Sequence, residues 1–206
     1  YRRFAFFERA FTAPDQLRQL TAYALSQILV VSDSGVLGVN PLGLASYYDT
    51  LLEHSFGNYR DLLIAVTLHP SMGFFLSHVN NAKTDTDANT FPDENYAREL
   101  MQLFSIGLYE LHPDGSQKLD VNGNPIATYD NEDIQEFAKI FTGLAYGPSD
   151  RAPQFGRNQA VFEVPMVMFD EYHEPGEKRL LNGKVVADGQ TGLEDIEEAI
   201  DNLFNH

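Results

Sequence analysis

The sequence predicts a mainly α fold: a helical core with a small β-hairpin and an irregular, β-containing C-terminal segment. Three observations lead to this prediction. Apolar residues recur at helical spacing over most of the first 143 positions, between residues that typically begin and end helices. The pair Asn122-Gly123 stands in a short run typical of a tight hairpin turn. After Gly143 the helical rhythm gives way to glycine, proline and alternating residues.

Helices are expected where apolar spacing agrees with the positions of proline, glycine and capping residues. Pro14 and Pro41 each stand at the expected first position of a helix. His69-Pro70 interrupts the helical pattern, because the residue before a proline disfavours helix. The expected helices cover residues 14–31, 41–57, 58–66, 72–79, 94–106, 130–143 and 193–206.

Residues 94–106 carry the clearest helical pattern of the chain. Their apolar side chains fall on one face, and Gly107 is expected to end the helix. Leu100 and Phe104 belong to that face, so both are expected to be almost wholly buried. This helix is therefore predicted to be central to the core.

A β-hairpin is predicted over residues 118–126. Asn122-Gly123 would occupy its turn, with positive φ at one or both residues, because tight hairpin turns require that conformation.

The chain is expected to be one incomplete domain, residues 1–206, of a larger protein. Residues 1–143 would form its helical core and residues 144–192 an irregular β-containing segment, while residues 193–206 would begin a further helical region. The first residue is Tyr1, and the last helical pattern is still in rhythm at His206 without a capping signal. Both ends are therefore expected to continue into longer sequence.

The net charge of the chain limits the kinds of molecule that it is expected to bind. The chain has 30 acidic and 14 basic residues, a net charge of −16 at pH 7. Such a surface repels phosphate backbones, so nucleic acid is excluded as an expected partner, whereas basic proteins and metal ions would be attracted. The chain has no cysteine, which removes thiolate chemistry. No apolar run is long enough to span a bilayer.

An acidic loop offers a candidate calcium site. Asp85, Asp87 and Asn89 alternate along the chain and Asp93 follows, which is the spacing of oxygen ligands in calcium loops. Thr90 stands where such loops place glycine, so a solvated acidic loop is the alternative. Residues 120–124 alternate in the same way, but the hairpin turn explains them without a metal.

A second candidate is a divalent-metal site built from Glu99, His173 and Asn95. Asn95 and Glu99 share one helix face beside the apolar stripe, and His173 stands among carboxylates. Histidine and carboxylate are ordinary metal ligands, and histidine also transfers protons near neutral pH. The alternative is a polar cluster that pins the loop around His173 to the helix. The common hydrolase signatures are absent from the sequence.

Several strings, in this order and spacing, resemble the domain of unknown function 1800 family across essentially the whole chain. The most specific is PDENYARELMQLF at residues 92–104, whose NYARE portion is the family's signature. The other strings are QLRQ (16–19), ALSQI (24–28), GNYRDLL (57–63), TLHP (67–70), FTGL (141–144), HEPGEK (173–178) and LLNG (180–183).

The resemblance implies an exported bacterial protein, periplasmic or extracellular, whose relatives are longer than this chain. It also implies a partner encoded nearby, an exported protein resembling sulfatases and phosphatases. It supplies no catalytic residues.

Two functions are therefore expected as alternatives. The first is a scaffold or binding module that acts with a partner protein. The second is a metal-dependent enzyme, such as a hydrolase, that uses Glu99 and His173 with a divalent metal ion.

Overall fold

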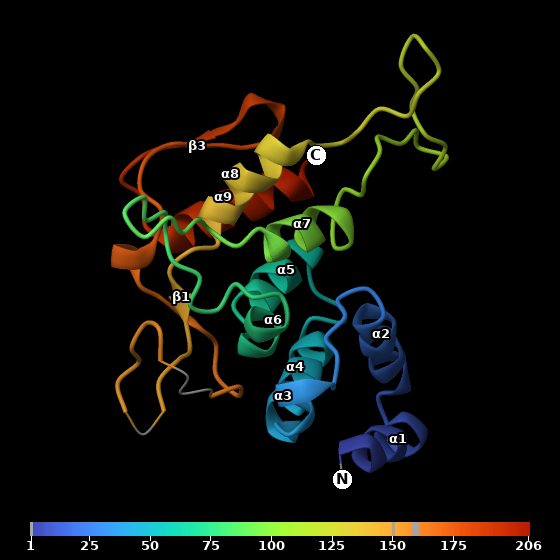
Figure 1. The fold of residues 1–206 in the computed structure, drawn as a ribbon. Helices are drawn as coiled ribbons and strands as arrows, with labels where there is room; N and C mark the ends of the chain where they lie inside the picture. Colours follow the sequence, from blue (N-terminus) through green and yellow to red (C-terminus); the bar gives the residue numbers. More distant parts are fainter. Residues whose placement is uncertain (1, 150, 158–160) are drawn as a thin grey trace. The chain divides into compact units, whose positions relative to one another are not determined.

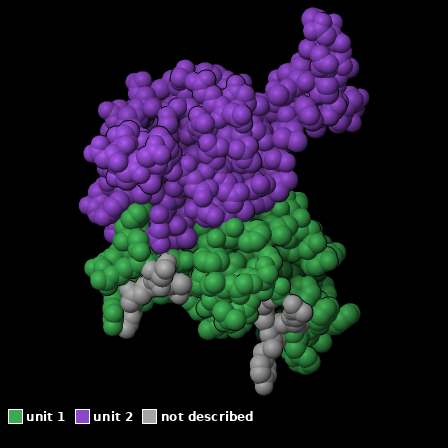
Figure 2. All heavy atoms as spheres, in the orientation of Figure 1, with its two compact units in different colours: residues 1–75, 145–167 green, residues 76–144, 168–206 purple. Residues whose placement is uncertain are grey.

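The mainly α fold is confirmed in the computed structural model, which describes residues 2–149, 151–157 and 161–206 (Figure 1). The chain divides into two compact units that interleave in sequence (Figure 2). Unit 1 comprises residues 1–75 and 145–167, and unit 2 comprises residues 76–144 and 168–206. No helix among the described residues has both the length and the apolar character needed to cross a membrane.

Unit 1 is built around one central helix, α4 (Pro41–Glu53), which contacts α2, α3, α5 and α6. Its inward face carries Leu44, Tyr47 and Leu51, which are at most 5% exposed. The surrounding helices are α1 (Arg2–Thr12), α2 (Gln16–Ser26), α3 (Gly35–Gly38), α5 (Tyr59–Thr67) and α6 (Pro70–Phe75).

Phe162 attaches the later segment of unit 1 to this helical group. A Cβ atom on Gly43 of α4 would lie 2.2 Å from the Cβ of Phe162, so only glycine leaves room for that ring. Phe74 and Tyr146 meet the same ring edge to face. Aromatic pairs of this geometry add to the stabilisation from burial alone.

The boundaries of several helices in unit 1 differ from the prediction. Pro14 does not begin a helix: it lies in the turn after α1, and α2 begins at Gln16. The predicted helices 14–31 and 41–57 end earlier, at Ser26 and Glu53. The helices α1 and α3 were not predicted. Apolar periodicity alone does not show where a short turn interrupts a helical pattern.

The interruption at His69-Pro70 is confirmed. The side chain of His69 contributes to it as well as the proline. The His69 Nδ1 atom accepts a hydrogen bond of 3.1 Å from the backbone N–H of Ser71, so the imidazole caps α6. Consequently α6 begins at Pro70 rather than Met72. It ends at Phe75, two residues before Ser77 adopts a positive φ of 66°.

Unit 2 contains α7 (Asn95–Gln102), α8 (Asn131–Ile140) and α9 (Gly192–Phe204), with α8 in contact with both of the others. Tyr96 of α7 is fully buried, stacked on His78 and edge-on to Phe141. Capping boxes begin α8 at Asp130 and α9 at Thr191. The expected burial of Leu100 and Phe104 is confirmed, since their exposed fractions are 0% and 4%.

The α7 helix is shorter than the predicted 94–106. The backbone N–H groups of Ile106 and Gly107 both bond to Met101 O, which turns the chain, and Gly107 has a φ of 76°. The short elements of unit 2 are η1 (Asp170–Tyr172), β3 (Lys178–Arg179), η2 (Leu181–Gly183) and β4 (Val185–Val186); β3 pairs antiparallel with β4. Two further strands, β1 (Leu144–Ala145) and β2 (Val167–Met168), pair with each other.

The predicted hairpin is present as part of an exposed arm, residues 108–128, visible in Figure 1 as the extended segment between α7 and α8. Leu119 and Pro125 form an antiparallel bridge, and the N–H of Gly123 bonds to Asp120 O. Gly123 has a φ of 86°, as its place in the turn requires. Two other bridges, Tyr109 with Ala127 and Leu111 with Gln117, extend the arm.

Replacing Leu100 by alanine should lower the free energy of unfolding by about 2–5 kcal/mol, the usual result of opening a cavity in a packed core. Leu103, at the end of the same helix, is 57% exposed and provides the control. Leu103→Ala should change stability by no more than about 0.5 kcal/mol. Urea unfolding followed by circular dichroism measures both, and equal effects would contradict the core position of Leu100.

Acid should destabilise the protein through His69. Burial lowers the pKa of His69 from 6.5 to about 4. Between these values the unfolded chain binds the proton and the folded chain does not, so stability falls as pH decreases from about 6.5 to 4, by about 3 kcal/mol. His69→Asn keeps a capping acceptor but cannot titrate. The unfolding free energy of this variant should therefore depend less on pH between about 6.5 and 4.

Unfolding free energies measured across this pH range, for both proteins, test the expectation. His112→Asn, in the exposed arm, is the matched control and should follow the original protein. A slope that His69→Asn leaves intact would show that other groups cause the acid sensitivity.

Candidate functional site

The strongest polar cluster among the described residues is buried in unit 2 and consists of His173, Lys178 and Asp195. These side chains come from the loop after η1, from β3 and from the first turns of α9. Their exposed fractions are 5%, 3% and 0%. Lysine and aspartate are rarely so deeply buried unless they are paired.

Asp195 joins the other two residues through a single carboxylate oxygen. Its Oδ2 atom lies 2.7 Å from Lys178 Nζ and 2.9 Å from His173 Nε2. Lys178 Nζ is also 3.3 Å from His173 Nε2, so the three polar atoms form a closed triangle. The other carboxylate oxygen, Oδ1, accepts from Gln190 Nε2 at 3.3 Å.

The C-terminal end of α8 fixes the opposite side of the imidazole. His173 Nδ1 lies 3.0 Å from the carbonyl oxygen of Thr142, which is a hydrogen-bond acceptor, so Nδ1 carries a proton. The Thr142 hydroxyl donates to Lys139 O and accepts from the backbone N–H of Glu174. The ring is thereby oriented from both sides.

Two glycines allow the backbone to close around His173. A Cβ on Gly192 would lie 2.6 Å from Met168 Sδ and 3.0 Å from His173 Nδ1. Gly143 has a φ of 88°, and a Cβ there would lie 3.1 Å from the backbone nitrogen of His173. Larger residues at either position would push the His173 loop away from α9.

The electrostatic balance favours a charged Asp195. Burial alone would raise the pKa of this carboxyl, but hydrogen bonds from His173 and Lys178, together with the positive charge of Lys178, hold it below the ordinary value of 3.8. The resting cluster therefore contains a carboxylate paired with an ammonium group. Such a pair is costly to break, because either partner alone would be an uncompensated buried charge.

Chemically, this cluster holds a loop and a helix together, and it is closed to a diffusing substrate. Its polar atoms bond to one another and to the backbone, and the side chains have almost no contact with solvent. Glu174 adds a further attachment, since its Oε2 accepts from the backbone N–H of Thr84.

Glu99 and Asn95, the other predicted metal ligands, have different neighbours. Glu99 is half-buried on α7. Burial raises the pKa of Tyr129. The positive charge of Arg98 opposes this shift, and the Glu99 carboxylate adds to it. Asn95 donates its backbone N–H to Asp93 Oδ1. Within the described ranges, no hydrogen bond or ion pair joins Glu99 or Asn95 to His173.

The metal assignments stay predictions. In the part of the chain that the structure describes, no group of three or more His, Cys, Asp or Glu side chains is arranged to hold a metal ion. In the candidate calcium loop, Asp85 Oδ1 accepts the backbone N–H groups of Asp87 and Ala88, and Asn89 has a positive φ of 53°. These features are those of a tight turn closed by the bridge between Asp85 and Thr90.

Sequence reasoning missed Asp195 and Thr142. Asp195 stands in an acidic helix start, Glu194-Asp195, where carboxylates are common and usually exposed. The position of Asp195 beside apolar residues was the one usable signal. It immediately precedes Ile196 and lies one turn before Ala199, and both of these residues are buried in α9.

Asp195→Ala should lower the free energy of unfolding by about 3–5 kcal/mol, because Lys178 would then be buried without its counter-charge. Glu198→Ala provides the contrast on the same helix. Glu198 pairs with Lys184 at the surface, where the two side chains are 32% and 48% exposed, so this loss should be no more than about 1 kcal/mol. Urea unfolding of both variants measures these losses. A small loss of unfolding free energy in Asp195→Ala would argue against a structural role for Asp195.

Comparison with known proteins places the chain in a family. No curated protein and no solved structure matches it significantly. The family model described as "Protein of unknown function (DUF1800)" matches residues 2–206, and the chain therefore belongs to the DUF1800 family.

Proposed function

We propose that this chain is a non-enzymatic binding module that recognises a protein with a basic surface through unit 2. The observation that carries the proposal is the distribution of charge. Unit 2 has 22 acidic and seven basic residues, a net charge of −15, whereas unit 1 has eight and seven, a net charge of −1. A general requirement for solubility does not account for this separation, whereas concentrating the negative charge in unit 2 favours attraction of a cationic partner there.

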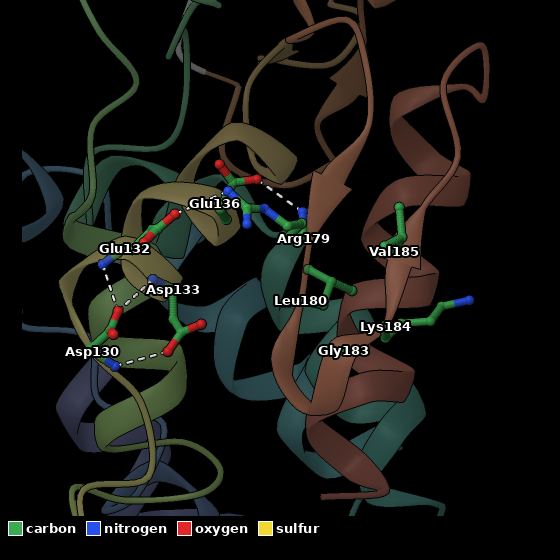
Figure 3. A pocket seen from close by; sticks show the side chains of 9 residues that line it. All are labelled: Asp130, Glu132, Asp133, Glu136, Arg179, Leu180, Gly183, Lys184 and Val185. Atoms are coloured by element: carbon green, nitrogen blue, oxygen red, sulfur yellow. Dashed lines mark hydrogen bonds and ion pairs between the residues drawn. The ribbon is translucent and has the colours of Figure 1, made fainter.

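A groove of about 230 Å³ in unit 2 concentrates this charge. It lies between the start of α8 and the β3–β4 hairpin, and Figure 3 shows the side chains that line it. The carboxylates of Asp130, Glu132, Asp133 and Glu136 come from one side. Arg179 neutralises part of this charge, pairing with Glu132 at 3.0 Å.

The groove also contains apolar surface suited to contact with a protein. Val185 on the hairpin is 44% exposed, whereas Leu180, which also lines the groove, is only 4% exposed. Protein interfaces commonly combine an apolar centre with a charged rim that directs association. A basic segment with interspersed apolar residues matches both properties.

The buried cluster supports a non-enzymatic role. His173 has the chemistry of a proton-transfer residue, but it is 5% exposed and its ring nitrogens contact Thr142, Lys178 and Asp195. A general base must reach its substrate within hydrogen-bond distance or through one water. The family resemblance suggests an exported location and an exported partner related to sulfatases and phosphatases, and both belong to this proposal.

Binding to a defined basic probe tests the proposal. A fluorescein-labelled peptide of alternating lysine and leucine should bind the intact chain at low salt and dissociate at 1 M salt, where the Debye length is about 3 Å. Glu132→Gln/Glu136→Gln removes two groove charges and keeps hydrogen-bonding oxygens. This variant should bind at least about threefold more weakly, because Glu132, which is 69% exposed, and Glu136, which is 14% exposed and paired with Lys139, both lose their charge.

The matched control removes two exposed carboxylates from unit 1, as Glu8→Gln/Glu53→Gln, and changes the net charge equally. It should bind the peptide like the original chain. An equal loss in both variants would mean that only overall charge matters. No binding of the peptide at low salt would also reject the proposal.

A further inference from the structure

Lys178 and Asp195 are placed as the two reactants of an amide bond. Lys178 Nζ lies 2.7 Å from Asp195 Oδ2, and both residues are at most 3% exposed. An amine and a carboxyl group in water do not condense measurably, because water competes and the groups separate. Enclosure and fixed orientation remove both obstacles, since effective concentrations of about 10⁵–10⁸ M occur in well-oriented intramolecular reactions.

We propose that Lys178 and Asp195 become joined by an intramolecular amide cross-link after folding, with His173 carrying the proton. The cross-link connects β3 to α9 through side chains within unit 2. It concerns the maturation of the chain itself and is independent of partner binding.

The reaction balances without any other reagent. His173 passes its Nε2 proton to Asp195 Oδ2 and takes one proton in return from the Lys178 ammonium, and the free Nζ lone pair then attacks Asp195 Cγ. The C–N bond forms, the bond from Cγ to Oδ2 breaks, and Oδ2 leaves with two protons from the former ammonium group as one water. Nothing is oxidised or reduced, and His173 returns to its starting protonation state.

His173 is placed to move the proton between the reacting atoms. Its Nε2 atom is 3.3 Å from Lys178 Nζ and 2.9 Å from Asp195 Oδ2, so one ring nitrogen reaches both the nucleophile and the leaving oxygen. Thr142 O holds the other nitrogen and prevents the ring from turning away. A group that transfers a proton must lie within hydrogen-bond distance of both the donor and the acceptor atom.

Gln190 has a positioning role at the remaining oxygen. Its Nε2 lies 3.3 Å from Asp195 Oδ1, which becomes the negatively charged oxygen of the tetrahedral intermediate and then the amide carbonyl. A donor directed at that oxygen stabilises the developing charge. The two carboxylate oxygens therefore have different environments: Oδ1 stays as the amide oxygen, and Oδ2 leaves as water.

The cluster also determines the pace of the reaction. The pKa of Asp195 is held below its ordinary value, so the resting pair is charged and unreactive. Attack requires the neutral form of the pair, and the hydrogen bonds from His173 and Lys178, with the charge of Lys178, keep that form rare. The expected reaction is slow and occurs once per molecule, and exclusion of water keeps the product from hydrolysis.

Mass spectrometry of the intact chain is the direct test. The folded protein, followed in time from refolding, should become lighter than its sequence mass by one water. Trypsin should then fail to cleave after Lys178, and the fragment ending at Arg179 should remain attached to residues 185–206, which contain no lysine or arginine. A folded protein that retains its full sequence mass would overturn the proposal.

Two variants and one internal control separate the cross-link from other losses of water. Lys178→Arg preserves the ion pair but cannot form the amide, so it should keep its full mass. His173→Gln should react much more slowly, and an unchanged rate would refute the proton-carrying role of His173. Lys184 and Glu198 lie 2.6 Å apart at the surface without an imidazole, and they should stay unlinked. A water loss that maps to this pair would contradict the requirement for burial.

Discussion

The burial of one carboxylate, Asp195, is the constraint on which unit 2 depends. A carboxylate with no solvent contact must be balanced by charge and hydrogen bonds, and here Lys178 and His173 supply both. Satisfying Asp195 brings the His173 loop and β3 against α9, while Thr142 ties the same loop to the end of α8. One buried charge thereby organises a segment with little regular secondary structure.

Unit 1 depends on shape rather than on charge. The absence of a side chain at Gly43 lets Phe162 pack directly on α4, and Phe74 and Tyr146 pack against that ring. Its buried histidine, His69, is neutral because burial lowers its pKa to about 4, and it caps α6 in that state. The two units are therefore expected to respond to acid over different ranges: unit 1 as pH falls from about 6.5 to 4 through His69, and unit 2 only as pH falls below the ordinary aspartate pKa of 3.8 through Asp195.

The separation of charge connects the fold to the proposed function. The start of α8 directs four carboxylates toward the groove, while Ile134 and Phe137 of the same helix face the core. The buried cluster joins β3 to α9 and, through Thr142, joins the His173 loop to the end of α8. A rigid acidic surface loses little conformational entropy on binding, which favours recognition of a basic partner.

Helix positions were largely predictable because their signals are local: Asp130 caps α8, Asn58 caps α5, and Leu100 shows its burial through helical spacing. The local signal at Pro14 was misleading, because this proline lies in the turn before α2 and not at the first position of the helix. The sequence alone determined the mainly α class, the acidic charge and the turn at Gly123. Only the tertiary structure decided which groups neutralise Asp195, because residues distant in sequence meet there and no local spacing records a long-range contact.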